Sequence, residues 1–356
     1  MNFMRAFAAV LVALFVAAAP AHAKPQPKRA NLAQLARNLV RAGAPGAIVY
    51  LRTPTGTRAG VAGYADRDAH VSMRAADRYR IASLTKAFVS VLVLQLEAEA
   101  KLDIDDAVET WRPGVVPNGG AISLRRLMNH TSGLFDYTAD ETFGKQLLAA
   151  PGRTWTPQEL LALGFAHAPL FAPGTNWTYS NTNYVVLGLL VEKLTGKPLA
   201  QALQERIFTP LNLASTSFPS TITLEPDFVH GYFQSNDVTP LLGPTWAWAA
   251  GGIVSNARDV TTFYRALLTG RLIPSAQLRE LERPADVAGV YGLGIETSVT
   301  TCGRTYGHAG DFLAWRNIVI ATANGKRQAV VMVNADETTV AWARLGTLVQ
   351  TALCRG

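Results

Sequence analysis

The strand-like segments of this chain lie near its two ends, and a long helical stretch separates them. Apolar alternation predicts strands at Pro45–Leu51, Thr57–Tyr64, Leu293–Thr300, Thr305–Gly307, Phe312–Ala321 and Gln328–Asn334. The turn at residues 53–56 joins the first two, and Asn324-Gly325 is a strong hairpin signal between the last two. We therefore predict an α/β (α+β) fold: an antiparallel sheet built from the N- and C-terminal segments and flanked by helices. Residues from about 105 to 285 form an inserted, mainly helical lobe, and a site is expected in the cleft between the lobe and the sheet.

Helical periodicity supplies the flanking layers. We predict an Asn-capped helix at residues 31–42, a long apolar helix over Ser83–Ala100 and a final helix over Glu337–Leu353. The middle of the chain contributes Ser123–His130, Pro157–Ala166, Asn181–Thr195, Pro198–Ile207, Ala257–Thr269 and Ser275–Glu282. The sequence contains no internal repeat and no low-complexity segment, which favours one domain.

Residues 1–23 have the pattern of a secretory signal peptide. Arg5 precedes an almost purely apolar run from Ala6 to Ala19, and Ala21-His22-Ala23 is a small-x-small cleavage pattern. An uncleaved membrane anchor is the competing interpretation, but the short apolar run favours cleavage. We expect a secreted or periplasmic protein whose single mature domain spans residues 24–356.

The composition fits a globular chain with a large hydrophobic core. Hydrophobic residues make up 49% of the chain and charged residues 17%. The formal net charge is +7, and the basic residues are scattered along the sequence without an aromatic-interleaved stripe. The charge therefore indicates general attraction to anionic surfaces or polymers, and no nucleic-acid recognition. No later apolar run is long enough to span a bilayer, and we expect a monomer without a stable membrane span.

Cys302 and Cys354 are the two cysteines of the chain. An even count in an exported protein indicates a disulfide, which would attach the C-terminal end to a strand near residue 302. Two buried free thiols are the alternative. The five histidines after residue 23 are far apart, and there is no Cys-x-x-Cys or Cys/His spacing, so we expect no metal and no other cofactor.

The segment Ser83-Leu84-Thr85-Lys86 opens the long apolar helix. Serine is a weak nucleophile unless a base lies beside it, and a lysine three residues later lies on the same helix face. The positive end of the helix dipole favours the neutral amine that a base needs. Alone the motif is weak, because most such pairs are an N-cap followed by a solvated lysine.

Two further short motifs follow. In Tyr179-Ser180-Asn181, positions two apart face the same way, so the Tyr179 phenol and the Asn181 amide can point into one pocket. A tyrosine beside an ammonium group loses its proton more easily and can act as a base. The alternative is a packed Tyr179 and an N-capping Asn181.

The third motif is His308-Ala309-Gly310, between two strand-like segments. Gly310 leaves room for a substrate backbone against a strand edge. The amide of Asp311 could pair with the amide of Ser83 as an oxyanion hole. A strand-end turn with a structural His308 is the alternative.

Ser-x-x-Lys, Tyr-x-Asn and His-x-Gly occur in this order and at wide spacing. The chain thereby resembles the serine penicillin-recognising enzymes: class C β-lactamases, low-molecular-weight penicillin-binding proteins, and related esterases and D-amino-acid peptidases. It is most similar to the secreted D-alanyl-D-alanine carboxypeptidases of the Streptomyces type, over nearly all of residues 24–356. Other resembling stretches are Gly43–Ala47, Tyr79–Asp103, Met128–Tyr137, Tyr179–Leu213, Tyr291–Gly294 and the late cysteine pair.

The resemblance implies a mechanism and the lobed fold predicted above. Ser83 attacks a carbonyl, Lys86 and Tyr179 share the proton transfers, and Asn181 positions the acyl-side amide. His308 belongs to the catalytic motifs, and Gly310 lines the substrate-binding strand edge. Which of Lys86 and Tyr179 takes the first proton is left open, because the pair titrates as a coupled unit. Trp246 falls where the carboxypeptidases have a cleft-lining aromatic residue, and Phe143 is a second candidate.

The sequence departs from the carboxypeptidase pattern at the third motif. Those enzymes bind the substrate carboxylate with two threonines flanking the motif glycine and an arginine on the adjacent strand; here the positions hold Ala309, Asp311 and Glu296. If positions 309 and 311 line the cleft, two acids face an anionic leaving group. Like charges at about 4–6 Å disfavour binding by roughly 1–3 kcal/mol. We expect weakened D-Ala-D-Ala specificity and a neutral or cationic leaving side: an ester, an amide or a peptide with a basic group.

These observations favour an exported serine hydrolase that forms an acyl-enzyme on Ser83, D-alanyl-D-alanine carboxypeptidase- or β-lactamase-like. The alternative is an esterase or a D-amino-acid peptidase or amidase of the same fold, with a peptidoglycan-type peptide, ester or amide as substrate. A non-hydrolytic penicillin or peptide sensor and a purely structural exported protein are less favoured. An α/β-hydrolase is disfavoured because the Gly-x-Ser-x-Gly elbow is absent.

Overall fold

The structure is a computed structural model that describes residues 29–222, 225, 227–285, 287 and 289–356. The predicted signal peptide, residues 1–23, lies outside the described residues. In the part of the chain that is described, no helix has the length and apolar character needed to cross a membrane.

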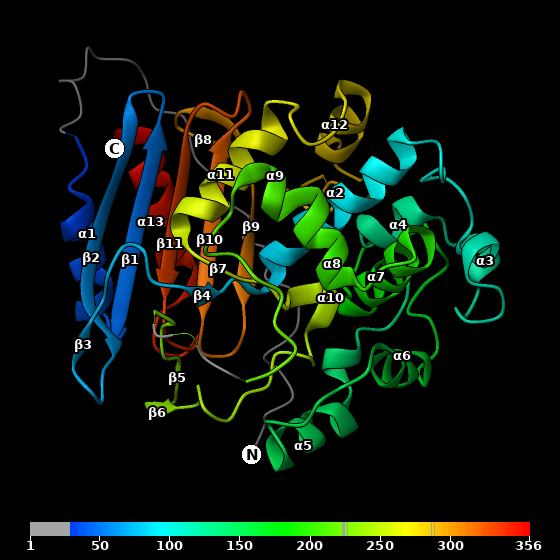
Figure 1. Ribbon diagram of the computed structural model, residues 1–356, viewed down its shortest axis with the longest axis horizontal. Helices are drawn as coiled ribbons and strands as arrows, with labels where there is room; N and C mark the ends of the chain where they lie inside the picture. Colours follow the sequence, from blue (N-terminus) through cyan, green and yellow to red (C-terminus); the bar gives the residue numbers. More distant parts are fainter. Residues whose placement is uncertain (1–28, 223–224, 226, 286, 288) are drawn as a thin grey trace.

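A seven-stranded antiparallel sheet forms the centre of the fold, in the order β3-β2-β1-β11-β10-β9-β8 (Figure 1). Strand β1 from the N-terminal segment pairs with β11 from the C-terminal segment, with Ala47 opposite Val333. This pairing confirms that the two ends of the chain build one sheet. The strands are β1 Gly46–Thr53, β2 Gly56–Asp66, β3 Val71–Ser72, β8 Glu296–Thr300, β9 Gly303–Asp311, β10 Arg316–Thr322 and β11 Gln328–Val333.

Helices α1 (Leu32–Arg41) and α13 (Trp342–Arg355) pack on one face of the sheet. Asn31 caps α1 as predicted, and its side chain accepts a hydrogen bond from the Gln34 amide at 3.1 Å. Leu39, Val49, Val331 and Val349 belong to the apolar core between this helical layer and the sheet. We call this side of the sheet the outer face.

The opposite, inner face is covered by α11 (Ala257–Leu268), with α2 (Thr85–Ala98) behind it. The rings of Phe88 on α2 and Phe263 on α11 stack at 3.6 Å between centroids. Although α11 falls within residues 105–285, it packs on β1, β10 and β11, so this part of the predicted helical lobe belongs to the sheet layer.

The helical lobe lies beside the inner face, around the buried helix α7 (Asn181–Thr195). Figure 1 shows α4, α6, α8 and α10 grouped around α7. The other lobe helices are α3 Val108–Trp111, α4 Leu124–Met128, α5 Glu141–Ala149, α6 Pro157–Phe165, α8 Leu199–Leu203, α9 Thr209–Leu211, α10 Trp248–Gly251 and α12 Ser275–Glu282. A π-helical turn, Gln204–Phe208, continues α8. Short strands pair β4 (Tyr79–Arg80) with β7 (Val254–Ser255), and β5 (Tyr232–Phe233) with β6 (Asn236–Asp237).

The C-terminal hairpin differs from the sequence prediction. Strand β9 continues to Asp311, so the His308-Ala309-Gly310 motif lies inside a strand and not between two strands. The apolar residues after it form a tight turn, in which the Phe312 amide donates to the Trp315 carbonyl at 2.9 Å and Leu313 has φ 58°. Phe312 and Trp315 are buried, which explains why this turn has the hydrophobic pattern of a strand.

The final helix also begins later than predicted, at Trp342 instead of Glu337. The Asp336 carboxylate accepts hydrogen bonds from the Thr339 amide at 2.9 Å and from the Thr338 hydroxyl at 2.7 Å. These side-chain bonds hold residues 336–339 in a turn, and such bonds compete with helical ones.

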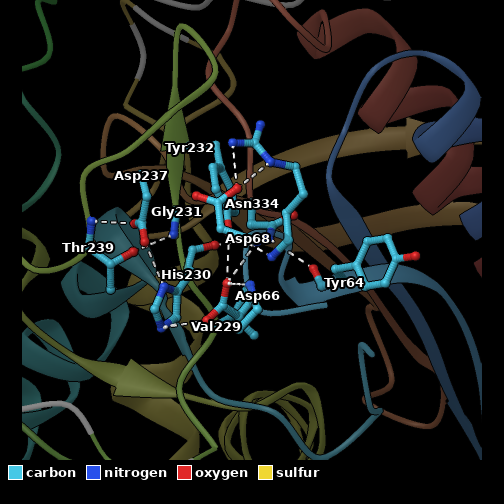
Figure 2. A network of polar contacts seen from close by, with 12 residues as sticks. Tyr64, Asp66, Asp68, Val229, His230, Gly231, Tyr232, Asp237, Thr239 and Asn334 are labelled. Atoms are coloured by element: carbon cyan, nitrogen blue, oxygen red, sulfur yellow. Dashed lines mark hydrogen bonds and ion pairs between the residues drawn. The ribbon is translucent and has the colours of Figure 1, made fainter. Parts of the chain in front are cut away.

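A polar network fastens the segment 229–239 to the end of the sheet (Figure 2). His230 contacts Asp237 at 2.7 Å through Nδ1, and the Asn334 amide donates to the His230 carbonyl at 2.9 Å and to the Tyr64 carbonyl at 3.2 Å. The Trp315 indole donates to the Val229 carbonyl at 2.7 Å. The network therefore also supports the β9–β10 turn, which directly follows the third motif.

Cys302 and Cys354 form a disulfide with Cα atoms 5.4 Å apart, as predicted. The bond joins the β8–β9 turn to the end of α13.

Candidate active site

The nucleophile candidate Ser83 lies in a short 3₁₀ turn, Ala82–Leu84, immediately before α2. Ala82 has φ 51°, a left-handed conformation that is costly for a residue with a Cβ and that is found preferentially at functional sites. Both neighbours of Ser83 are buried, whereas Ser83 itself is partly exposed. The turn thus presents the hydroxyl to a substrate while its flanks remain in the core.

Lys86 lies one helical turn later and is completely buried. Its Nζ is 3.2 Å from Ser83 Oγ, 2.8 Å from Asn181 Oδ1 and 2.7 Å from the Ala250 carbonyl oxygen. The structure therefore brings together the first two predicted motifs. Asn181 begins α7, and Ala250 belongs to α10, so the helical lobe supplies both lobe-side contacts to the amine.

Asp136 fixes the orientation of the Asn181 amide. The Asn181 amide nitrogen donates to Asp136 Oδ2 at 3.0 Å, and an ionised carboxylate can only accept. The amide oxygen must then point at Lys86. Burial raises the pKa of Asp136, while the nearby Lys86 charge opposes that rise. Sequence reasoning did not include Asp136 among the site residues, although it lies within the resembling stretch at 128–137.

The environment of Lys86 suits a neutral amine. Burial lowers its pKa to about 7, against a smaller opposing effect from Asp136. A neutral amine has two N–H donors and one lone pair. The two carbonyl oxygens of Asn181 and Ala250 accept the two donors, which leaves the lone pair for the Ser83 hydroxyl. This arrangement can take a proton from Ser83.

Tyr179 lies beside Lys86 and Ser83. Its ring centroid is 4.7 Å from Lys86 Nζ, and the Ser83 side chain is near enough to affect the pKa of its phenol. We expected a neighbouring ammonium to lower the pKa of Tyr179. Instead, burial raises that pKa well above its ordinary value, with the Ser83 hydrogen bond as the main opposing effect. The phenol is therefore protonated in the free protein, which favours Lys86 as first proton acceptor and Tyr179 as donor.

His130 holds the backbone on both sides of Tyr179, and sequence reasoning did not single it out. Its carbonyl accepts from the Thr178 amide at 3.1 Å, and its Nδ1 accepts from the Ser180 amide at 3.2 Å. Its ring lies 4.3 Å from the Tyr179 ring. Burial, and next the charge of Lys86, lowers the pKa of His130 well below its ordinary value. The signal was its place in the resembling stretch Met128–Tyr137.

The edge of β9 provides the candidate oxyanion hole. Strand β8 begins at Glu296, opposite Gly307, so the later residues of β9 extend beyond it. Phe312 and Trp315 form a hydrogen-bonded pair, so alternation makes Asp311–Arg316 a non-hydrogen-bonded pair. The Asp311 amide therefore faces away from β10, toward the uncovered edge. This geometry supports its predicted pairing with the Ser83 amide.

Gly310 brings this edge against the nucleophile turn. A Cβ at residue 310 would lie 2.5 Å from the Ile81 carbonyl oxygen and 3.0 Å from the Leu84 side chain. Any side chain there would push β9 away from Ser83. The glycine is needed for close approach of the two backbones, whereas we had expected it to make room for substrate.

His308 is buried, with both ring nitrogens in contact with neighbours. Nε2 is 2.8 Å from the Tyr291 hydroxyl, and Nδ1 contacts the Ala309 carbonyl. Burial, and then the charge of Lys86, lowers its pKa to about 3. A neutral imidazole held in this way positions the β9 edge, and a direct role in proton transfer stays a prediction.

Asp311 and Ala309 do not line the cleft as expected. The Asp311 carboxylate is 3.4 Å from Nε of the buried Arg316, and Ala309 packs against the outer apolar core. We had expected Asp311 and Glu296 to repel an anionic leaving group. Because Arg316 compensates the charge of Asp311, the expected repulsion from Asp311 is wrong. Glu296 remains: its Oε1 accepts from the Ala309 amide at 3.4 Å, its side chain is 45% exposed, and within the described residues its basic neighbour is the neutral His308, 3.8 Å away. Burial raises the pKa of Glu296 to about 7.

The two aromatic candidates are both buried, with Trp246 5% exposed and Phe143 1% exposed, and they differ in what they contact. The ring centroids of Trp246 and Phe312 are 4.4 Å apart. Phe312 directly follows Asp311, so Trp246 lies at the end of β9. Phe143 is only 1% exposed and packs on Tyr137, Trp155 and Trp246. Phe143 is therefore a core residue that supports Trp246, and its expected place on the cleft wall is wrong.

An accessible serine, a buried lysine with a lowered pKa and a free strand edge, set between a sheet and a helical lobe, define a serine hydrolase of the β-lactamase and penicillin-binding-protein fold. The chain belongs to the Beta-lactamase family, whose sequence profile matches residues 32–353. The family resemblance and the fold class predicted from the sequence are both confirmed.

Curated relatives include a putative penicillin-binding protein, PbpX, of Bacillus subtilis, 30% identical over 65% of this chain and 56% of that protein. A D-aminopeptidase of Brucella ovis is 29% identical over 77% of this chain and 53% of that protein. The chain thus spans about half the length of the curated relatives it matches.

The chain covers a larger share of the solved structures that it matches than of the curated relatives. A D-stereospecific amidohydrolase from Streptomyces sp. superimposes with a TM-score of 0.81 at 36% identity, over 89% of this chain and 98% of that one. A D-amino acid amidase from Ochrobactrum anthropi SV3 also gives 0.81, at 26% identity, over 90% and 96%.

Proposed function

We propose that this protein is an exported D-stereospecific amidase or peptidase that works through an acyl-enzyme on Ser83. The contact between Ser83 Oγ and the buried Lys86 amine, at 3.2 Å, carries the proposal. The similarity to a D-stereospecific amidohydrolase and a D-amino acid amidase supports the choice of substrate class. A D-alanyl-D-alanine carboxypeptidase or β-lactamase is the competing function, supported by the penicillin-binding-protein relative.

The site geometry supports the following steps of acyl transfer. The neutral Lys86 amine takes the Ser83 proton as Oγ attacks the carbonyl carbon, and the Ser83 and Asp311 amides stabilise the oxyanion. Tyr179 gives its proton to the leaving nitrogen and regains one from Lys86. Water then attacks the acyl-enzyme by the same transfers in reverse, which frees Ser83.

Glu296 favours a leaving side without negative charge. Its partly exposed carboxylate lies at the uncovered edge of β9 beside residue 309, two residues from the oxyanion amide. Two residues of a strand span about 7 Å, so a leaving group extended along this edge reaches the carboxylate. An amide or a basic peptide fits there, whereas a terminal carboxylate meets like charge once Glu296 is ionised, above the pKa of about 7 to which burial raises it.

The first test combines covalent labelling with turnover. Residues 24–356 and the Ser83→Ala variant are treated with a fluorophosphonate and with benzylpenicillin, and the intact mass is measured. We expect fluorophosphonate labelling only when Ser83 is present, and hydrolysis of D-phenylalanine amide faster than of the L-enantiomer. Faster turnover of a Lys-D-Ala-D-Ala peptide with high penicillin acylation would favour the competing carboxypeptidase. Labelling without turnover of any substrate would identify a sensor.

Export is part of the proposal, and the disulfide supports it because disulfides persist in oxidising compartments. The N-terminus of the protein recovered from outside the cytoplasm should begin near Lys24. A recovered chain that retains residues 1–23 would contradict cleavage.

A further inference from the structure

Arginines that are distant in the sequence lie close together in the folded chain. Arg52, Arg265 and Arg271 line a pocket of about 450 Å³ with Thr262 and Thr269. Arg52 lies near the end of β1, Thr262 and Arg265 lie on α11, and the other two follow α11 (Figure 1). The pocket therefore forms where the end of a strand meets the end of the helix on the inner face. Its residues are distinct from those of the catalytic site.

Among the described residues, the positive charge of this pocket has no acidic partner. None of the three arginines forms an ion pair there, and the lining contains no Asp or Glu. Arg52 is half-buried, and its described side-chain contact is a donation to the neutral Thr262 hydroxyl at 2.8 Å.

The pKa of Arg52 is lowered from its ordinary value, mainly by burial and in part by neighbouring cations. Burial lowers its pKa first; Tyr50 opposes that effect, and the charges of Arg265 and Arg258 lower the pKa further. The C-terminal end of α11 offers a partial negative charge of about half a unit. That dipole cannot balance three guanidinium groups, so the pocket keeps a net positive charge.

The donors available to a ligand are guanidinium groups. The Thr262 and Thr269 hydroxyls already donate to the Arg258 and Arg265 carbonyls, at 2.8 and 2.7 Å. Guanidinium presents paired N–H donors in a planar fork that matches phosphate oxygens. Several cations around one hollow suit adjacent phosphates better than a single carboxylate.

We propose that this arginine pocket binds an oligophosphate group, either as a small anion or as a segment of a phosphate-bearing polymer. Occupation leaves Ser83, Lys86 and Tyr179 free. The pocket would thereby hold the hydrolase on an anionic polymer while the catalytic cleft remains open to substrate.

Calorimetric titration of the folded protein at 150 mM salt tests the proposal with tripolyphosphate and with long-chain polyphosphate. We expect saturable binding that weakens at least tenfold in the Arg265→Gln/Arg271→Gln variant. Both side chains are exposed, so the variant should fold. The matched control, Arg37→Gln/Arg344→Gln, removes two exposed arginines from α1 and α13 and should change affinity less than twofold.

The two probes distinguish the sources of phosphate. Equal affinity per site for both identifies a small-anion site, and tighter binding of the polymer identifies a polymer segment; either result supports the pocket. Equal losses in the two double variants, or no saturable binding of either probe, would overturn the proposal. The measurement uses no hydrolysis, so its failure is separate from failure of the proposed amidase activity.

Discussion

Two buried basic side chains lie on opposite sides of strand β9, and they differ in whether they can release a proton. Lys86, on the inner side, contacts two carbonyl oxygens and the Ser83 hydroxyl. Arg316, on the outer side, contacts the Asp311 carboxylate at 3.4 Å and the Val340 carbonyl, and its guanidinium lies 3.9 Å from the Trp342 ring. Both side chains are completely buried.

The difference shows that burial of a cation yields a base only with the right side chain and partners. Burial lowers the pKa of Lys86 to about 7, so it can shed its proton near neutral pH. Burial also lowers the pKa of Arg316, but Asp311 opposes the change, and a guanidinium keeps its charge in proteins. One cation is therefore available for chemistry, and the other neutralises an acid next to the oxyanion strand.

Removing Lys86 should produce the largest effect. In Lys86→Ala, Ser83 loses its proton acceptor, and acylation should slow by about 10³-fold or more. Stopped-flow measurement of fluorophosphonate labelling would check this. Thermal unfolding of the same sample provides the folding control, because loss of a buried amine should not unfold the chain. Labelling within tenfold of wild type would show that Lys86 is not the main base.

Removing Arg316 should affect stability rather than chemistry. In Arg316→Met, the Asp311 carboxylate loses its partner, and the free energy of unfolding should fall by about 3 kcal/mol. That estimate is at the low end because Asp311 is partly exposed. Urea unfolding would measure it. The acylation rate of the folded variant should stay within about tenfold, so a loss as large as in Lys86→Ala would abolish the contrast between the two cations.

The sequence predicted the strands and the terminal pairing for physical reasons, whereas the roles of Ser83 and Lys86 were inferred from the family resemblance. Alternation marks β1 and β2, and the spacing of Ser83 and Lys86 within one helical turn keeps them adjacent. The turn at Phe312–Trp315 was misassigned because its apolar residues enter the core instead of continuing the strand. Hydrophobic pattern alone does not distinguish these two outcomes.

The side-chain directions around β9 were not predictable either. Ala309 and Asp311 share a strand face, but which face meets the cleft depends on pairing with β10 and on Arg316. The arginine pocket shows the same limit, since Arg52 and Arg265 are distant in sequence and adjacent only in the fold. The positions of these charged side chains depend on tertiary contacts and not on the local sequence pattern.

Substitutions of His130 test whether Tyr179 needs this residue to keep its phenol in place. In His130→Leu, the Ser180 amide loses its acceptor and the Tyr179 ring its neighbour, so kcat should fall between about 10- and 100-fold through misplacement of the phenol. KM for a D-amino acid amide should change little. His130→Asn, which keeps an acceptor, should recover part of kcat. Equal losses of kcat in both variants together with raised KM would indicate a general structural defect.

The pH dependence should show the smallest and most specific effect. Because Lys86 acts as a neutral amine and its pKa is about 7, acylation should fall about twofold at pH 7 and about tenfold at pH 6 relative to its alkaline plateau. Between pH 7 and 10 the unfolded chain binds the extra proton at this lysine, so the Lys86 contribution to stability rises with pH. Arg316 itself does not titrate in this range. A profile flat from pH 6 to 9 would mean that Lys86 is already neutral at pH 6 or that another group accepts the first proton, and the Lys86→Ala rate would separate these two cases.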